Sequence, residues 1–212
     1  MEYDVVLRKQ SIESMILSSM EVFPRETNGY LAGNVTKSPS SYAFKNLMPY
    51  CLQTDIRKWE SVSHGNERAV NRVIRSFRTF GHTLVGGWHS HPETKAKGGS
   101  KRVCGSGLAY LTESDLETIR EEMGRMEKEG NGLDNRWLEV VTTVNKRDYS
   151  GRHEVGCSLR EYARKIGCLL AHADKGYSIM INAWVLDFYD DIEQEPRITE
   201  AKIHVPELES GF

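Results

Sequence analysis

The stretch from Thr83 to Pro92 reads TLVGGWHSHP. Its first part is a short apolar run, which is the pattern of a buried β-strand. The run leads into two histidines, His89 and His91, that are separated by one residue. Because side chains alternate along an extended chain, both histidines point the same way if the extended segment continues through them. The stretch therefore predicts a strand that delivers two imidazoles to one metal ion.

Helix and strand patterns alternate on both sides of this stretch. Helical spacing of apolar residues, or a helix-opening polar residue, marks the candidate helices 11–23, 66–80, 112–128 and 158–173. Apolar and β-rich runs mark the further candidate strands 29–35, 42–48, 137–145, 177–188 and 198–205. Such an order is typical of a layered α/β or α+β domain. We therefore expect a mixed β-sheet flanked by helices.

Length and charge narrow the class of protein. The chain has 212 residues, 28 basic and 30 acidic side chains, and a mean hydropathy of -0.52. This length suits one well-buried core, and the charge balance argues against wholesale nucleic-acid binding. No apolar run reaches the ~18 residues of a membrane helix, and the N-terminus lacks a secretory signal. Four cysteines without a C-x-x-C pair fit a reducing cytoplasm. We expect one soluble, cytoplasmic domain over residues 1–212, with neither membrane nor nucleic acid as a partner.

A carboxylate follows the two histidines at the start of the next candidate helix. Asp115 lies three residues after Thr112, a position that suits a helix N-terminus. Two histidines and one carboxylate, with an open fourth position, make a catalytic zinc set. Zinc lowers the pKa of a bound water to about 7, and a nearby carboxylate can then act as general base. The alternative interpretations are a polar turn for the histidines and a plain helix cap for Asp115 and Thr112.

Residues 24–33 read PRETNGYLAG and supply a candidate base. Glu26 lies between a helix end and a strand start, which is a good place to present a carboxylate to a cleft. Glu21 is the rival base, but it lacks the Gly-x-Leu-x-Gly context that follows Glu26. The alternative for Glu26 is a solvated loop carboxylate.

Three motifs occur in order: E-x-x-G-x-L-x-G from Glu26, H-S-H-P from His89 and T-x-x-D from Thr112. Together they resemble the JAMM/MPN metalloprotease family, also called JAB, over residues 5–145, whereas the part from about 146–212 is less diagnostic. The resemblance implies a single MPN-like domain with a Zn²⁺ cofactor. Family members cleave isopeptide or peptide bonds after the C-terminal tail of ubiquitin or ubiquitin-like proteins. Some prokaryotic relatives act on small sulfur-carrier proteins or simpler peptides.

The resemblance also implies a role for each matching residue. The implied zinc ligands are His89, His91 and Asp115. Glu26 is the implied general acid/base, Thr112 replaces the family's oxyanion-donating serine, and Ser90 is a supporting residue of the catalytic site. The implied activity is that of a zinc-dependent isopeptidase of the prokaryotic, deubiquitinase-like type. Its implied partners are ubiquitin or a ubiquitin-like protein and the conjugates of that protein.

Two features depart from the family pattern. Threonine at position 112 keeps the hydroxyl but has a more restricted rotamer than serine. The gap between His91 and Asp115 is 23 residues, beyond the short spacer of the family. We interpret residues from about 93–110, which are rich in Gly, Lys and Ser, as a loop inserted near the active site. Cys104 lies in this loop, either as a thiolate that closes the open zinc position or as a free thiol.

Two functions of other kinds remain open at this stage. A non-catalytic MPN scaffold within a larger complex would carry no bound zinc. A hydrolase of small peptides or amides would cleave short amides and leave protein conjugates intact. Zinc content and a substrate panel separate these from the isopeptidase.

Overall fold

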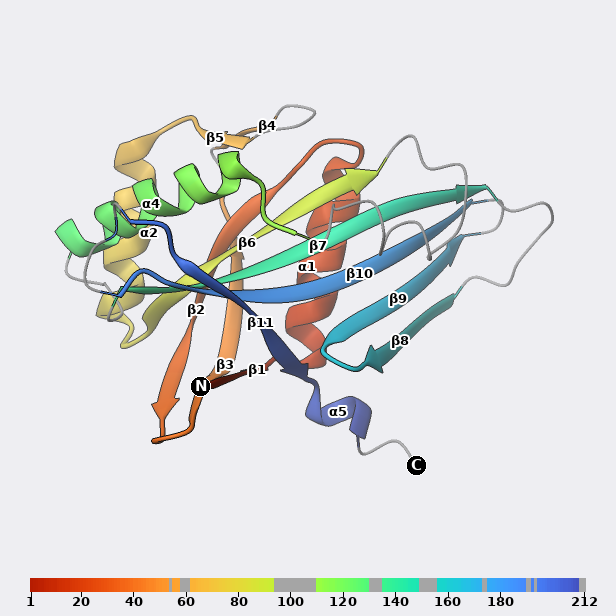
Figure 1. Ribbon diagram of the computed structural model, residues 1–212. Helices are drawn as coiled ribbons and strands as arrows, with labels where there is room; N and C mark the ends of the chain where they lie inside the picture. Colours follow the sequence, from red (N-terminus) through yellow and green to blue (C-terminus); the bar gives the residue numbers. More distant parts are fainter. Residues whose placement is uncertain are drawn as a thin grey trace.

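The computed structural model describes residues 1–53, 55–57, 62–93, 110–129, 135–148, 156–172, 175–189, 192 and 194–209 (Figure 1). In chain order its elements are β1 (Glu2–Val6), α1 (Lys9–Val22), β2 (Asn28–Lys37), β3 (Ser41–Cys51), β4 (Asp55–Arg57), β5 (Val62–His64), α2 (Glu67–Thr79), β6 (Thr83–Glu93), α4 (Glu113–Lys128), β7 (Arg136–Asp148), β8 (Gly156–Tyr162), β9 (Lys165–His172), β10 (Lys175–Asp187), β11 (Arg197–His204) and α5 (Pro206–Glu209). Most of the predicted insertion, including Cys104, falls outside these residues. Within them, no helix is both long enough and apolar enough to span a membrane.

The central sheet is mixed and curls back on itself. Its strand order is β11-β1-β3-β2-β6-β7-β10-β9-β8, and β11 also pairs with β10. The pairs β1–β11, β1–β3 and β6–β7 are parallel, whereas the other pairs of this sheet are antiparallel. Strands β4 and β5 form a separate hairpin. The predicted mixed sheet with flanking helices is confirmed.

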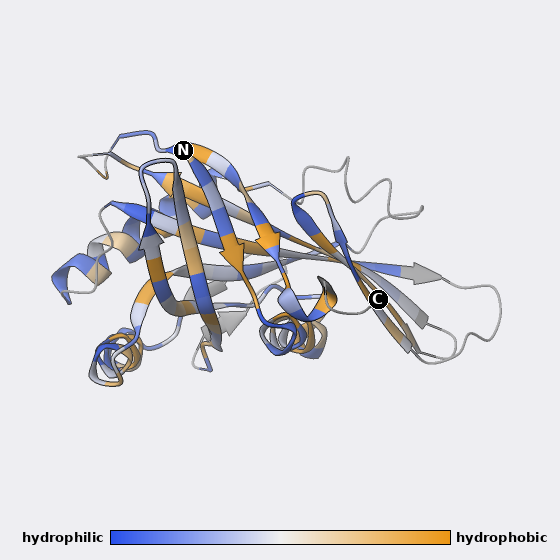
Figure 2. Ribbon diagram, turned by 90° about the horizontal axis from the view of Figure 1, so that it is seen from below, coloured by the Kyte–Doolittle hydropathy of each residue, from blue (hydrophilic) through white to orange (hydrophobic). Residues whose placement is uncertain are grey.

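Two groups of buried apolar side chains cover the two faces of the sheet. Helix α1 contributes Ile12, Met15 and Ile16 to the larger group. Helices α2 and α4 contribute to the second group through residues that include Val70, Ile74, Phe77, Ile119 and Met123. Figure 2 shows both polar and apolar residues along the helices, as expected for helices with one buried face. Because side chains alternate along β7, Leu138 joins the first group and Trp137 the second.

The helix predicted over residues 158–173 is wrong. Strands β8 and β9 occupy this segment and form an antiparallel hairpin, in which Tyr162 pairs with Lys165. Ala163, in the turn, has a φ of 55°, outside the right-handed helical region. The buried residues Ile166 and Cys168 recur at a spacing of two, and β9 pairs along β10 from Ile166 to His172. Pairing with the neighbouring strands therefore overrides the local helical pattern. Strand β1 and the β4–β5 hairpin were not predicted.

Two glycines allow neighbouring strands to approach closely around β6. A Cβ atom at Gly86 would lie 1.8 Å from the carbonyl oxygen of Leu138 on β7. A Cβ atom at Gly29 on β2 would lie 2.0 Å from the carbonyl oxygen of Tyr50 and 2.5 Å from the indole nitrogen of Trp88. Because backbone atoms cannot move aside cheaply, any larger residue at these positions forces the strands apart.

We expect Gly29→Ala to lower the free energy of unfolding by about 1–3 kcal/mol, because the added methyl group overpacks the β2–β3 pair. In Gly124→Ala, on α4, the added methyl group has no neighbouring atom within 4 Å. It should raise the free energy of unfolding by about 0.5–1 kcal/mol, because alanine favours a helix over glycine. Urea denaturation of the two variants measures both changes. Equal effects of the two variants would contradict the close approach at Gly29.

Candidate metal centre

Strand β6 brings the two predicted histidine ligands together. His89 and His91 lie on the same face of the strand, and their ring centroids are 4.6 Å apart. Their Nε2 atoms are 3.0 Å apart. His91 is 5% exposed and the side chain of His89 is 12% exposed, so both imidazoles are largely shielded from water. The polar-turn interpretation of these histidines does not fit, because β6 continues through both of them to Glu93.

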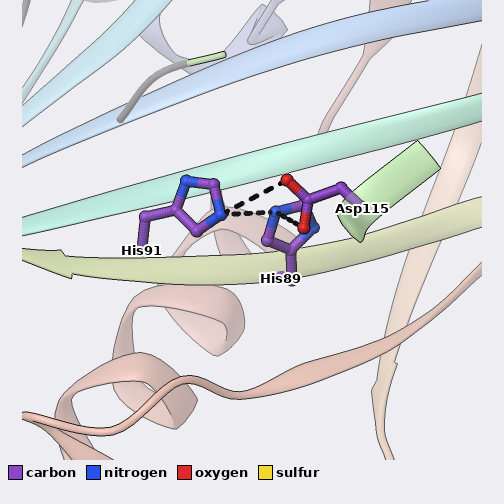
Figure 3. Close-up of side chains that lie close together, drawn as sticks. All are labelled: His89, His91 and Asp115. Atoms are coloured by element: carbon purple, nitrogen blue, oxygen red, sulfur yellow. Dashed lines mark hydrogen bonds and ion pairs between the residues drawn. The ribbon is translucent and has the colours of Figure 1, made fainter. Parts of the chain in front are cut away.

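Helix α4 delivers the third candidate ligand, Asp115, at its first turn. Thr112 is the N-cap, and its hydroxyl accepts a hydrogen bond from the Asp115 amide at 3.2 Å. The Asp115 carboxylate in turn accepts hydrogen bonds from the Thr112 amide at 2.6 Å and the Thr112 hydroxyl at 2.8 Å. This capping box fixes the carboxylate toward the imidazoles (Figure 3). Asp115 is therefore both a cap and a candidate ligand.

The three side chains lie close enough together to offer ligands to one metal ion. Asp115 Oδ1 lies 3.6 Å from His89 Nε2, and the other carboxylate oxygen, Oδ2, lies 3.7 Å from His91 Nε2. One ligand atom from each of the three residues lies within 4.8 Å of the other two. His89, His91 and Asp115 therefore form a group that could hold a metal ion.

A residue that sequence reasoning missed, Glu139 on β7, supports His89. Its Oε1 atom lies 2.6 Å from His89 Nδ1, and its Oε2 atom accepts a hydrogen bond from the Trp137 indole at 2.5 Å. Glu139 is only 4% exposed. In the neutral imidazole, Glu139 accepts a hydrogen bond from the Nδ1 proton, so the electron pair that can bind a metal is on Nε2 of His89. The available signal was a single carboxylate within the apolar run WLEVV.

The surrounding carboxylates change the protonation of His89. Burial by itself would lower the pKa of His89, since it disfavours the charged imidazolium. The hydrogen bond and charge of Glu139, with the charges of Asp115 and Glu26, outweigh burial and raise the pKa of His89 to about 9. In the metal-free site, the His89 imidazole therefore carries an extra proton at neutral pH, and a metal ion would have to displace this proton to bind.

Glu26, the predicted general base, lies just before β2 and close enough to raise the pKa of His89 by its charge. It is half-buried, whereas the rival Glu21 is exposed on α1. The residue after Glu26 is fixed to β6 by two hydrogen bonds. The Thr27 amide donates to Ser90 Oγ at 3.0 Å, and the Ser90 amide donates to the Thr27 carbonyl at 2.8 Å. Ser90 is thus positioned to hold the segment that carries Glu26, and it does not join the ligand group.

Glu122 anchors the middle of α4 to the same face of the sheet. Its carboxylate contacts the Tyr30 hydroxyl from β2 and lies 2.6 Å from His64 Nε2 on β5. Burial raises the pKa of Glu122, but these two contacts, with the charges of His64 and Arg125, bring the pKa below its ordinary value. The ionised carboxylate fixes α4, and hence Asp115, relative to β2.

Comparison with known protein families agrees with the motifs. Residues 8–97 match the family described as prokaryotic homologs of the JAB domain, so the resemblance is confirmed over that segment. The segment includes Glu26 and both histidines, whereas Asp115 lies beyond it. Among solved structures, the solution structure of a protein from Desulfitobacterium hafniense is 15% identical, with a TM-score of 0.46, and the similarity covers 95% of this chain and 92% of that one. No curated protein matches the chain.

We expect Glu139→Gln to weaken zinc binding about 10–100-fold while the protein stays folded. An amide nitrogen that donates to His89 Nδ1 would move the imidazole proton to Nε2, where it blocks the metal. The matched control is Glu121→Gln on the exposed side of α4. Competition with a chromophoric chelator measures the zinc affinity, and circular dichroism checks the fold. Wild-type affinity in folded Glu139→Gln would show that this carboxylate does not support the ligand.

Proposed function

Because residues 8–97 match the family of prokaryotic JAB homologs, we propose that this protein is a zinc-dependent peptidase or isopeptidase. The observation that carries the proposal is the convergence of His89, His91 and Asp115 beside a separate carboxylate, Glu26. Two imidazoles and one carboxylate leave a fourth zinc position open, which is the arrangement of catalytic rather than structural zinc sites. A scaffold protein would not need this arrangement.

In the proposed mechanism, His89, His91 and Asp115 hold the Zn²⁺ ion. Bound zinc supplies a Lewis acid for the scissile carbonyl and lowers the pKa of a water molecule to about 7. Glu26 takes the proton of the attacking water and passes it to the leaving amine. Ser90, through Thr27, holds the backbone next to Glu26, and Glu139 keeps the His89 imidazole in one orientation.

The Thr112 hydroxyl has two roles in this proposal. In the structure it hydrogen-bonds the Asp115 carboxylate and caps α4. We propose that, with substrate bound, the single proton of this hydroxyl turns from Asp115 to the oxyanion that develops on the substrate carbonyl, where the corresponding serine donates in the family. Such a donor is worth roughly 10²–10³-fold in rate when it is aimed at the developing charge.

We propose as substrate the extended C-terminal tail of a ubiquitin-like protein, joined to an amine by a peptide or isopeptide bond, with the enzyme acting in the cytoplasm. An extended tail presents its backbone for pairing with a strand edge, which gives affinity independent of side chains. Support comes from the family match and the metal-site geometry. Cleavage of short amides but not of conjugates would instead identify a hydrolase of small peptides.

We expect about one zinc ion per wild-type chain after reconstitution and much less in His91→Ala, because two remaining ligands bind zinc weakly. Elemental analysis of the dialysed proteins measures this ratio. His82→Ala, which changes a histidine outside the ligand group, is the matched control and should keep its zinc. A wild-type protein that takes up no zinc would contradict the catalytic proposal and favour the non-catalytic scaffold.

We expect Glu26→Gln to keep zinc but lose about 10²–10⁴-fold in kcat/KM, since the amide cannot accept the proton of the attacking water. Glu21→Gln, the same change at the exposed rival on α1, should retain activity. The assay follows cleavage of linear and isopeptide-linked conjugates of ubiquitin-like proteins and of short peptide amides. Near wild-type turnover by Glu26→Gln would show that another group is the base.

A further inference from the structure

Two cysteines meet on the hairpin at the far edge of the sheet. Cys157 on β8 and Cys168 on β9 place their Sγ atoms 3.2 Å apart. In the register of this hairpin, Cys157 pairs with Leu170 and Leu159 pairs with Cys168. The two thiols are therefore diagonal neighbours on one face of the hairpin, where side chains reach each other. The C-x-x-C spacing sought in the sequence does not describe this pair, because the strand pairing brings the two residues together.

The two thiols differ in their access to solvent. Cys157 is exposed, whereas Cys168 is 4% exposed and belongs to the larger apolar group. Burial and the neighbouring Cys157 sulfur raise the pKa of Cys168 well above its ordinary value. Cys157 is therefore the thiol that reacts with a dissolved oxidant, and Cys168 is the neighbouring thiol that can react with Cys157 afterwards.

We propose that Cys157 and Cys168 are a reversible redox site, which closes into a disulfide between β8 and β9 when the protein meets an oxidising low-molecular-weight disulfide. The Sγ atoms are 3.2 Å apart, about 1.2 Å farther than the 2.03–2.05 Å of a disulfide bond. This site is separate from the metal centre on β6 and α4, and it does not depend on the proposed hydrolase activity.

The reaction is ordinary thiol–disulfide exchange. The Cys157 thiolate attacks one sulfur of the oxidant, forms a mixed disulfide and releases one small thiolate. Cys168 then gives its proton to water, and its thiolate attacks Cys157 Sγ. This step forms the Cys157–Cys168 bond and releases the second small thiolate. Two protein thiols are thus oxidised by two electrons, and one small disulfide is reduced to two thiols.

The disulfide would fasten the edge strand of the sheet. Among the described residues, β8 pairs in the sheet with β9 alone, at the end of the strand order, and Glu161 on β8 accepts a hydrogen bond from the Val205 amide at 2.7 Å. A covalent link from exposed Cys157 to buried Cys168 would tie this edge to the core. The link restricts the unfolded chain and adds a covalent bond at an edge strand.

The test equilibrates the full-length protein with mixtures of reduced and oxidised glutathione, quenches the thiols and maps the linked peptides by mass spectrometry. We expect one peptide pair containing Cys157 and Cys168, lighter by two hydrogen atoms than the reduced pair. The melting temperature of the oxidised protein should be about 5–10 °C above that of the reduced protein.

Cys157→Ser is the informative variant, because this exposed side chain can be changed without disturbing the core. It should abolish both the linked peptide and the shift in melting temperature. Cys51→Ser, which changes a cysteine on β3, should leave both intact. A wild-type protein that keeps free thiols at every glutathione ratio would overturn the proposal. A link from Cys157 to Cys51 or Cys104 would overturn it as well.

Discussion

The parallel pairing of β6 with β7 sets the position of His89 relative to Glu139 in the candidate metal centre. This register places Gly87 opposite Glu139 and His89 opposite Val141, so the side chains of His89 and Glu139 lie on the same face of the sheet. A Cβ atom at Gly87 would come within 2.9 Å of Glu139 Oε2. Because Gly87 has no side chain, the Glu139 carboxylate has room beside it. A buried carboxylate is stable there because both of its oxygens are hydrogen-bonded.

Helix α4 brings the remaining ligand to this face by interactions of its own. The capping box of Thr112 fixes Asp115, and the contacts of Glu122 with Tyr30 and His64 fix the helix two turns later. The position of α4 is thus fixed by the cap at its N-terminus and by the contacts of Glu122 about two turns later. These contacts do not depend on the length of the segment that precedes the helix. Since the entropic cost of closing a loop rises slowly with its length, a long spacer between His91 and Asp115 is compatible with an intact ligand group.

Local patterns predicted the parts of the fold that depend on neighbouring residues in the chain. The histidine spacing, the Thr112–Asp115 cap and the helical stripe of α2 each involve residues within one or two turns or strand steps. The β8–β9 hairpin and the pairing of β10 with β11 depend on which strands meet in the sheet, and the Glu139–His89 contact joins residues 50 positions apart in the sequence. A helical pattern over 158–173 could not reveal that β10 offers this segment a partner. In the sequence, Glu139 is likewise an ordinary strand residue, because its contact with His89 exists only when β6 and β7 are paired.

The charges at the site explain why its residues favour a cation. Glu26, Asp115 and Glu139 all act on His89, so carboxylates outnumber the two imidazoles. Burying that many negative charges without compensation is unfavourable, and the metal-free protein compensates by holding a proton on His89. A divalent cation held by His89, His91 and Asp115 would take the place of this proton and balance the negative charge. Glu26 lies beside this group and outside it. One distribution of charge therefore accounts for both the candidate ligand group and the carboxylate next to it.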